Sequence, residues 1–439
     1  MIKRIWKEQE LVIASLGAAL LGITLLVGCE RVERSTAVEF EPNWVYAYQI
    51  GQRSEQAMDQ AVLETQAALT ELFGTPDEPK IPAVLASEEE FADLMTMEHL
   101  MAASGPPEEQ GRGLFRKHCA VCHGVTGNGR GPTAALLNPY PRDFRLGKFK
   151  FKSTPIGVKP TKEDIADTIR HGIPGTTMVK IPELSDEDIA ALTDYVIYLS
   201  MRGEVERSLL FEAGELVFAE GESLYNPALK ETDPEAFEEQ WEIIQDYVLD
   251  TAESWIEAPE EVVDIPQRDP AVVPETTEQL LAKIRAGDEA VLASVARGRE
   301  LFLSEKASCA KCHGKEGRGD GQTNDYDDWA KEWTKKFGLD YEDEFNQVPL
   351  IARGALPVRK IQPRNFEEGV FRGGSAPEEL YQRIALGIEG TPMPAAAAGS
   401  QATLTPEDVW DLVNYIRSLY QPKSDQEGTD TQAEALART

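Results

Sequence analysis

Two short runs of the chain combine cysteine and histidine in one spacing. Each has two cysteines three positions apart and a histidine directly after them: Cys119, Cys122 and His123, then Cys309, Cys312 and His313. On a helical turn, residues three apart share a face, so both thiols can reach the two vinyl groups of one porphyrin. The histidine can then ligate the iron. The pattern is typical of c-type haem attachment.

A single Cys-x-x-Cys also occurs in redox dithiols and as half of a zinc site. Here the motif occurs twice, each time followed by histidine and then by a glycine-rich run, 124–131 and 314–321. This repetition favours haem over both alternatives. We therefore predict two covalently bound haem c groups.

The segments around the two motifs align with each other. Residues 164–178 match 379–393 without a gap, and further matches lie on both sides of the motifs. The aligned pairs include Gly111 with Gly298, Phe115 with Phe302, Phe144 with Phe366, Met178 with Met393, and Tyr195 with Tyr415. Ser185 and Thr405 have the type and position of N-caps for a closing helix. The chain thus contains two copies of one module.

Each module resembles a class I cytochrome c domain, with a first helix, the Cys-x-x-Cys-His motif, an Ω-loop, a methionine loop and a last helix. The resemblance implies that Met178 and Met393 are the sixth iron ligands. His171 is the alternative to Met178, but its counterpart in the repeat is Leu386. The resemblance also implies that the first and last helices pack through one glycine and two aromatic residues. These are Gly111, Phe115 and Tyr195 in the first module, and Gly298, Phe302 and Tyr415 in the second.

The N-terminus resembles a bacterial lipoprotein signal peptide. Basic residues precede an uncharged apolar run at 11–28, which ends at Cys29. We predict that residues 1–28 are removed and that Cys29 carries the lipid anchor. The alternative is an uncleaved membrane anchor, which the length of the run allows. Either arrangement places the chain in the bacterial cell envelope, facing the periplasm.

We predict a mainly α fold with two cytochrome c domains joined by a helical, acidic connector. The parts are a signal peptide 1–28, an N-terminal helical extension 29–105, domain 1 at 106–203, the connector 204–290, domain 2 at 291–422 and a disordered tail 423–439. Domain 2 carries an aromatic insertion near 322–362, where Trp329, Trp333 and Phe337 share one helical face.

Local patterns predict three helices outside the modules. One covers 58–73 and stops at Gly74, and a second begins at Ser87 and continues through Met101. A long helix starts at Asp233-Pro234, which has the sequence of an N-cap followed by proline.

The net charge of −32 is unevenly distributed. Acidic residues gather in front of and between the modules, whereas bases cluster in domain 1 after Phe144. This cluster includes Lys148, Lys150, Lys152, Lys159 and Lys162. It is either a docking surface for an acidic partner or an internal contact with the acidic connector; the tethered connector favours the internal contact.

These features predict a membrane-tethered electron carrier, not an enzyme. Methionine ligation raises the haem potential, which suits transfer from a quinol-oxidising complex to a soluble cytochrome or terminal oxidase. No nucleic-acid partner is expected. One alternative is a dihaem cytochrome c peroxidase. A peroxidase haem needs an open or openable sixth iron-ligand position, whereas each module here offers a methionine at that position. Another is a structural or docking subunit of a quinol-oxidising or terminal oxidase complex.

Overall fold

The computed structural model describes residues 38–322, 326, 340, 342–397 and 403–422. These residues form helices joined by irregular segments, and the only β pairing in this part of the chain is isolated bridges. The prediction of a mainly α fold is confirmed. Cys29, the aromatic residues Trp329, Trp333 and Phe337, and the tail 423–439 lie outside the described residues.

The N-terminal extension is helical, as predicted, with four α-helices in the described part. They are α2 (Trp44–Ser54), α3 (Asp59–Phe73), α4 (Ala83–Ala86) and α5 (Met97–Ala103). The boundaries of α3 match the predicted helix, and Gly74 ends it at φ 71° while its N–H bonds to the Thr70 carbonyl. Glycine adopts this conformation without the steric cost that other residues incur.

The prediction of one continuous helix from Ser87 to Met101 is wrong. A 3-10 turn at Glu89–Phe91 is followed by non-helical residues, and α5 begins only after Thr96. The Ser87 hydroxyl donates to the Val84 carbonyl and caps no helix. Thr96 caps α5, because its hydroxyl oxygen accepts the His99 N–H at 3.2 Å.

The first module is built around one long helix. Its α-helices are α6 (Leu114–His118), α7 (Ala120–His123), α8 (Lys162–His171) and α9 (Asp186–Ala213). The α9 helix has 28 residues and therefore continues past position 203 into the segment assigned to the connector. It starts with the predicted cap at Ser185, and residues 191–203 are buried throughout. A helix that is buried on all sides acts as the axis of its domain.

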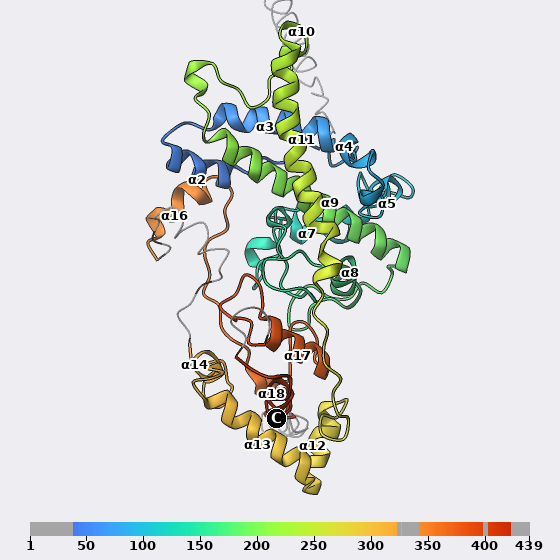
Figure 1. Cartoon of the computed structure of the whole chain (residues 1–439), viewed down its shortest axis with the longest axis vertical. Helices are drawn as coiled ribbons and strands as arrows, with labels where there is room; N and C mark the ends of the chain where they lie inside the picture. Colours follow the sequence, from blue (N-terminus) through green and yellow to red (C-terminus); the bar gives the residue numbers. More distant parts are fainter. Residues whose placement is uncertain (1–37, 323–325, 327–339, 341, 398–402, 423–439) are drawn as a thin grey trace, which may run out of the picture. The chain divides into compact units, whose positions relative to one another are not determined.

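The connector contributes α10 (Leu229–Thr232), α11 (Pro234–Ile256) and α12 (Thr277–Ala286). The predicted start of α11 is confirmed, since the Asp233 carboxylate accepts the Ala236 N–H and Pro234 is the first helical residue. In Figure 1, α11 runs from α10 down to the region of α7 and α8. Its buried Ile244, Val248 and Trp255 belong to the same core as the first module. The connector helix is thus part of the first module's core.

The second module has α13 (Glu289–Leu303), α14 (Cys309–His313), α16 (Glu344–Ile351), α17 (Pro377–Leu386) and α18 (Pro406–Ser418). Gly298 lies where α13 crosses α18, and a β-carbon there would overlap the Asp411 carbonyl. The rings of Phe302 and Tyr415 lie 5.2 Å apart beside this crossing. The predicted contact of the first and last helices is therefore confirmed in this module.

In the first module only part of that prediction holds. Phe115 and Tyr195 do make the aromatic contact, with ring centroids 5.2 Å apart. Gly111, however, lies outside any helix at φ 76°, and a β-carbon there would meet no atom within 4 Å. Here α5 contacts α9 more extensively than α6 does. The break between α5 and α6 removes Gly111 from the helix crossing.

Candidate functional site

The four cysteines of the two motifs are half-buried and form no disulfide. Burial raises the pKa of the Cys119 thiol to about 12 and that of Cys309 to about 11. Throughout the part of the chain that the structure describes, no cluster of three or more histidine, cysteine or acidic residues can hold a metal ion. The described residues therefore offer no complete set of zinc ligands at either motif.

Each motif histidine is oriented in the same way. His123 Nδ1 lies 3.0 Å from the Arg142 carbonyl oxygen, and His313 Nδ1 lies 3.4 Å from that of Arg364. A carbonyl oxygen only accepts, so Nδ1 carries the hydrogen and Nε2 keeps the lone pair that an iron ligand needs. Burial lowers the pKa of His123 and brings that of His313 to about 4. Both imidazoles are therefore neutral near pH 7.

Phenylalanine rings hold these imidazoles from one side. His123 stacks on Phe144 with ring centroids 4.7 Å apart, and His313 stacks on Phe366 at 4.6 Å. Each stack continues to a further ring, Phe149 in the first module at 6.1 Å and its equivalent Phe371 in the second at 6.0 Å. This third ring was not predicted. The sequence does contain an indication of it, because a phenylalanine lies five positions after each of the aligned residues Phe144 and Phe366.

The predicted methionine ligands lie in loops of matching hydrogen bonding. Met178 follows α8, and its carbonyl accepts the Ile173 N–H at 2.7 Å. Met393 follows α17, and its carbonyl accepts the Ile388 N–H at 3.1 Å. In both loops a threonine hydroxyl two residues earlier accepts the methionine N–H, at 3.1 and 3.2 Å. The alternative ligand His171 is 64% exposed and lies beside Asp167.

This set of side chains fits haem c. Two thiols offer thioether formation, a neutral imidazole offers nitrogen, and a thioether sulfur is available on a separate loop. Arg372 Nε is buried and has no hydrogen-bond acceptor among the described residues. A propionate carboxylate of the haem is a suitable acceptor for such a nitrogen. The residues present are therefore consistent with one haem in each module.

The two modules contact each other through their methionine loops. Glu389 of the second loop pairs with Lys152 at 2.5 Å, and the two side chains are only 7% and 4% exposed. A β-carbon at Gly175 of the first loop would come within 2.9 Å of Val370. Each methionine loop therefore lies against the other module.

In the basic cluster of domain 1, Lys152, Lys159 and Lys162 form ion pairs within the described part of the chain, and one of these three pairs is with the connector segment. Lys159 pairs with Glu204, the first residue of that segment, and Lys162 pairs with Asp194 at 2.6 Å within the domain. Lys152 pairs instead with the second module. The prediction of a connector contact is thus confirmed for Lys159 and wrong for Lys152.

Comparison with known proteins agrees with this geometry. The family model for cytochrome c matches residues 108–200 and 295–420. The chain is 30% identical over 115 residues to the Cbb3-type cytochrome c oxidase subunit CcoP of Helicobacter pylori. The matched region covers 25% of this chain and 34% of that subunit, so the chain spans about a third of the relative's length. A chain of a solved structure, the Kuenenia stuttgartiensis reducing HAO-like protein complex, aligns with this chain at 26% identity and a TM-score of 0.41. The alignment covers 74% of this chain and 97% of that chain.

Proposed function

Since residues 108–200 and 295–420 belong to the cytochrome c family, we propose that this chain transfers single electrons by means of two covalently bound haem c groups. Haem c supplies a one-electron redox couple when bound. We assign thioether formation to Cys119, Cys122, Cys309 and Cys312, and iron ligation to His123, Met178, His313 and Met393. The observation that carries the proposal is the duplicated arrangement of histidine, backbone carbonyl and phenylalanine around each motif.

The surrounding residues perform the tasks that such a site needs. The carbonyls of Arg142 and Arg364 hold each imidazole in one tautomer and one orientation. Partners of this kind make a histidine a more basic ligand and keep its ring fixed. The buried ring stacks exclude water from the same side. Little rearrangement of the protein is then needed when the charge of the site changes.

The contacts of each methionine loop with the other module support electron exchange between the two sites of one molecule. The buried Lys152–Glu389 pair links the second methionine loop to the first module. Each site then serves a different task, one toward the electron donor and the other toward the acceptor.

We further propose that the chain is tethered to the membrane and faces the periplasm, with Cys29 as the lipid-bearing residue. No helix among the described residues is long and apolar enough to cross a membrane. The named relative is a subunit of a cytochrome c oxidase, which supports a place in a respiratory chain. The donor would be a quinol-oxidising complex, and the acceptor a soluble cytochrome or a terminal oxidase.

Haem content and ligation test the proposal directly. A pyridine haemochrome assay should give two haems per chain. Met178→Ala and Met393→Ala should each remove about half of the weak near-infrared absorption of methionine-ligated ferric haem, because each change affects one of the two sites. One haem per chain, or a variant that loses all or none of this absorption, would refute the assignment. Rapid reduction of hydrogen peroxide by the unaltered protein would favour the dihaem peroxidase instead.

A further inference from the structure

The helix α16 carries apolar side chains on the side that faces solvent. Phe345, Val348 and Ile351 are 86%, 57% and 41% exposed. Residues three apart on a helix are neighbours, so these side chains form one patch, which we call the apolar face. The opposite side holds the helix in place, because Leu350 is fully buried and the Gln347 side-chain oxygen accepts the Val358 N–H at 3.3 Å. Single exposed apolar residues are ordinary, whereas a contiguous group indicates contact with a protein or a membrane.

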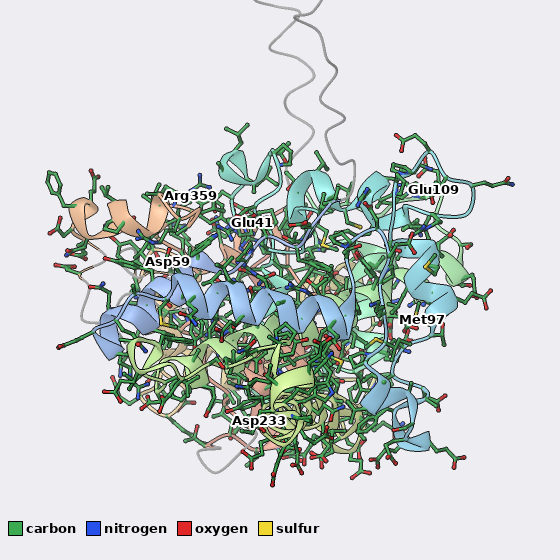
Figure 2. The ribbon with its side chains drawn as sticks, turned by 90° about the horizontal axis from the view of Figure 1, so that it is seen from above. Glu41, Asp59, Met97, Glu109, Asp233 and Arg359 are labelled. Atoms are coloured by element: carbon green, nitrogen blue, oxygen red, sulfur yellow. The ribbon has the colours of Figure 1, made fainter. Side chains whose placement is uncertain are left out.

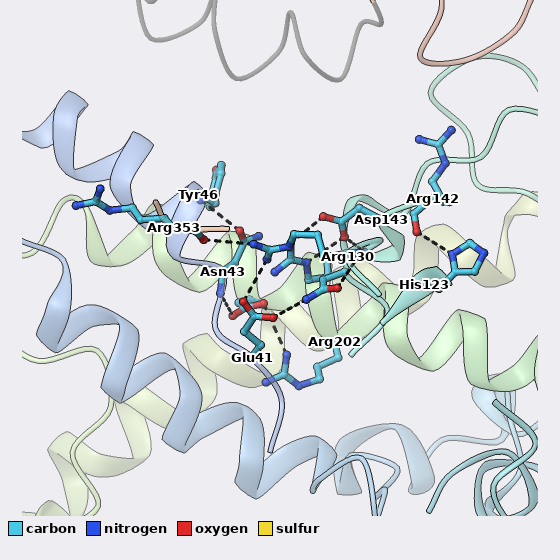
Figure 3. Close-up of polar contacts among 12 residues, drawn as sticks. Glu41, Asn43, Tyr46, His123, Arg130, Arg142, Asp143, Arg202 and Arg353 are labelled. Atoms are coloured by element: carbon cyan, nitrogen blue, oxygen red, sulfur yellow. Dashed lines mark hydrogen bonds and ion pairs between the residues drawn. The ribbon is translucent and has the colours of Figure 1, made fainter. Parts of the chain in front are cut away.

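The end of α16 is joined to the start of the N-terminal extension. Arg353 lies 4.2 Å from the ring of Tyr48 in α2, and its carbonyl accepts Nη1 of Arg130 at 3.3 Å. Nη2 of Arg130 lies 3.8 Å from the carboxylate of Glu41. Figure 3 shows Arg130 between Arg353 and Glu41. In Figure 2, α16 lies at the outer edge of the view beside the label of Arg359.

This position is close in sequence to the proposed lipid anchor. Cys29 precedes Glu41 by twelve residues, and twelve fully extended residues span at most about 40 Å. The proposed anchor therefore limits how far α16 can lie from the bilayer. A tethered surface meets its partner at a high effective concentration, so even a small apolar patch can bind. Binding of a helix at the lipid interface strengthens with the apolar area that it buries, and two signals anchor a protein more stably than one.

The charges beside the apolar face indicate the kind of lipid. Glu342, Asp343 and Glu344 precede it and are exposed. Anionic headgroups would repel these carboxylates, whereas a zwitterionic headgroup offers them a cationic nitrogen. We propose that the apolar face of α16 contacts the lipid bilayer that holds Cys29, and that it binds zwitterionic phospholipid in preference to anionic phospholipid. This inference rests on the lipid anchor proposed above.

Lipid contact can be measured on the full-length, haem-loaded and lipid-bearing chain in phosphatidylcholine vesicles. Ile351→Cys provides a thiol for a fluorescent label, because the native cysteines are assigned to haem and lipid. Leu292→Cys is the matched control, since Leu292 is also 41% exposed but lies on α13, far from α16 in Figure 1. Phosphatidylcholine that carries a nitroxide quencher should quench the label at position 351 and leave the label at 292 unaffected.

A second pair of changes tests the apolar face itself. Phe345→Asp together with Val348→Asp should abolish quenching at position 351 without unfolding α16, because both side chains are exposed. Replacing part of the phosphatidylcholine by phosphatidylglycerol should reduce the quenching, and an unchanged value would refute the preference for zwitterionic lipid.

Flotation of the vesicles separates failure of the anchor from failure of this inference. A chain that does not float with the vesicles would refute the lipid anchor and this inference together. A chain that floats but shows no quenching at position 351, or equal quenching at 351 and 292, would refute the contact of α16 alone.

Discussion

Replacement of Lys152 by methionine should destabilise the protein strongly, because it breaks the buried ion pair between the two modules. Lys152 and Glu389 lie 2.5 Å apart, and both are more than nine-tenths buried. The substitution keeps most of the side-chain volume but leaves the Glu389 carboxylate without its cation. Loss of one partner of a buried pair costs about 3–5 kcal/mol.

The two partners should not be equivalent. The Lys152 ammonium also donates to the carbonyl of Pro155 at 2.8 Å and to that of Val158. Glu389→Gln therefore leaves the ammonium with two acceptors and should cost less, about 1–3 kcal/mol. The double variant Lys152→Met/Glu389→Leu should recover most of the loss, because well-packed apolar residues can replace a buried pair at little cost.

Thermal unfolding followed by circular dichroism provides the assay. For domains of 150–250 residues, 1 kcal/mol shifts the midpoint by roughly 2–4 °C, so Lys152→Met should lower it by roughly 6–20 °C. The control is Lys311→Met, because Lys311 and Glu305 are also 2.5 Å apart but are 62% and 86% exposed. An exposed pair contributes about 0–1 kcal/mol. A loss in Lys152→Met no larger than that in Lys311→Met would refute the reasoning.

Three further predictions concern single residues. Gly298→Ala should destabilise the second module by about 3 kcal/mol, because the added β-carbon overlaps a carbonyl at the α13–α18 crossing. Gly111→Ala should cost only about 1 kcal/mol, because its β-carbon meets no atom and only the positive φ is unfavourable. Denaturant unfolding of the two variants would compare these losses of stability. Burial lowers the pKa of His99, but its contacts with Asp194 and Glu187 outweigh burial and raise the pKa above 6.5. The protonated His99 should therefore stabilise the fold fully below pH 6.5, and this stabilisation should disappear as the pH rises through the raised pKa. The stability difference between the unaltered protein and His99→Gln, measured by urea unfolding, should accordingly shrink from pH 5.5 to 8.5, by the linkage relation. Cys29→Ala should leave residues 1–28 attached, and N-terminal mass spectrometry would detect this; a mature N-terminus elsewhere would contradict the lipid anchor.

Most of the predicted haem-site residues follow from the sequence, because c-type attachment depends on short spacings. Two cysteines and a histidine within five residues define each motif, and the internal repeat locates Met178 and Met393. Helix starts are local as well, since the cap side chains of Ser185 and Thr405 each accept a backbone N–H from only three residues further on. The break before α5 was missed because Ser87 and Thr96 are both acceptable caps by sequence.

The partners of the charged and aromatic side chains were decided by the tertiary structure alone. Lys152 lies in a run of alternating lysines, and nothing in that run identifies Glu389 as its partner. The hydroxyl of Tyr140 donates to the Pro357 carbonyl across 217 positions of sequence, and Arg359 spans a similar separation to reach Leu137. A local pattern determines which side chains share a face of a helix or lie within one turn. It does not determine which distant segment covers that face, because this depends on how the whole chain packs. The two cysteine motifs could therefore be identified from the sequence, whereas the contact between the modules could not.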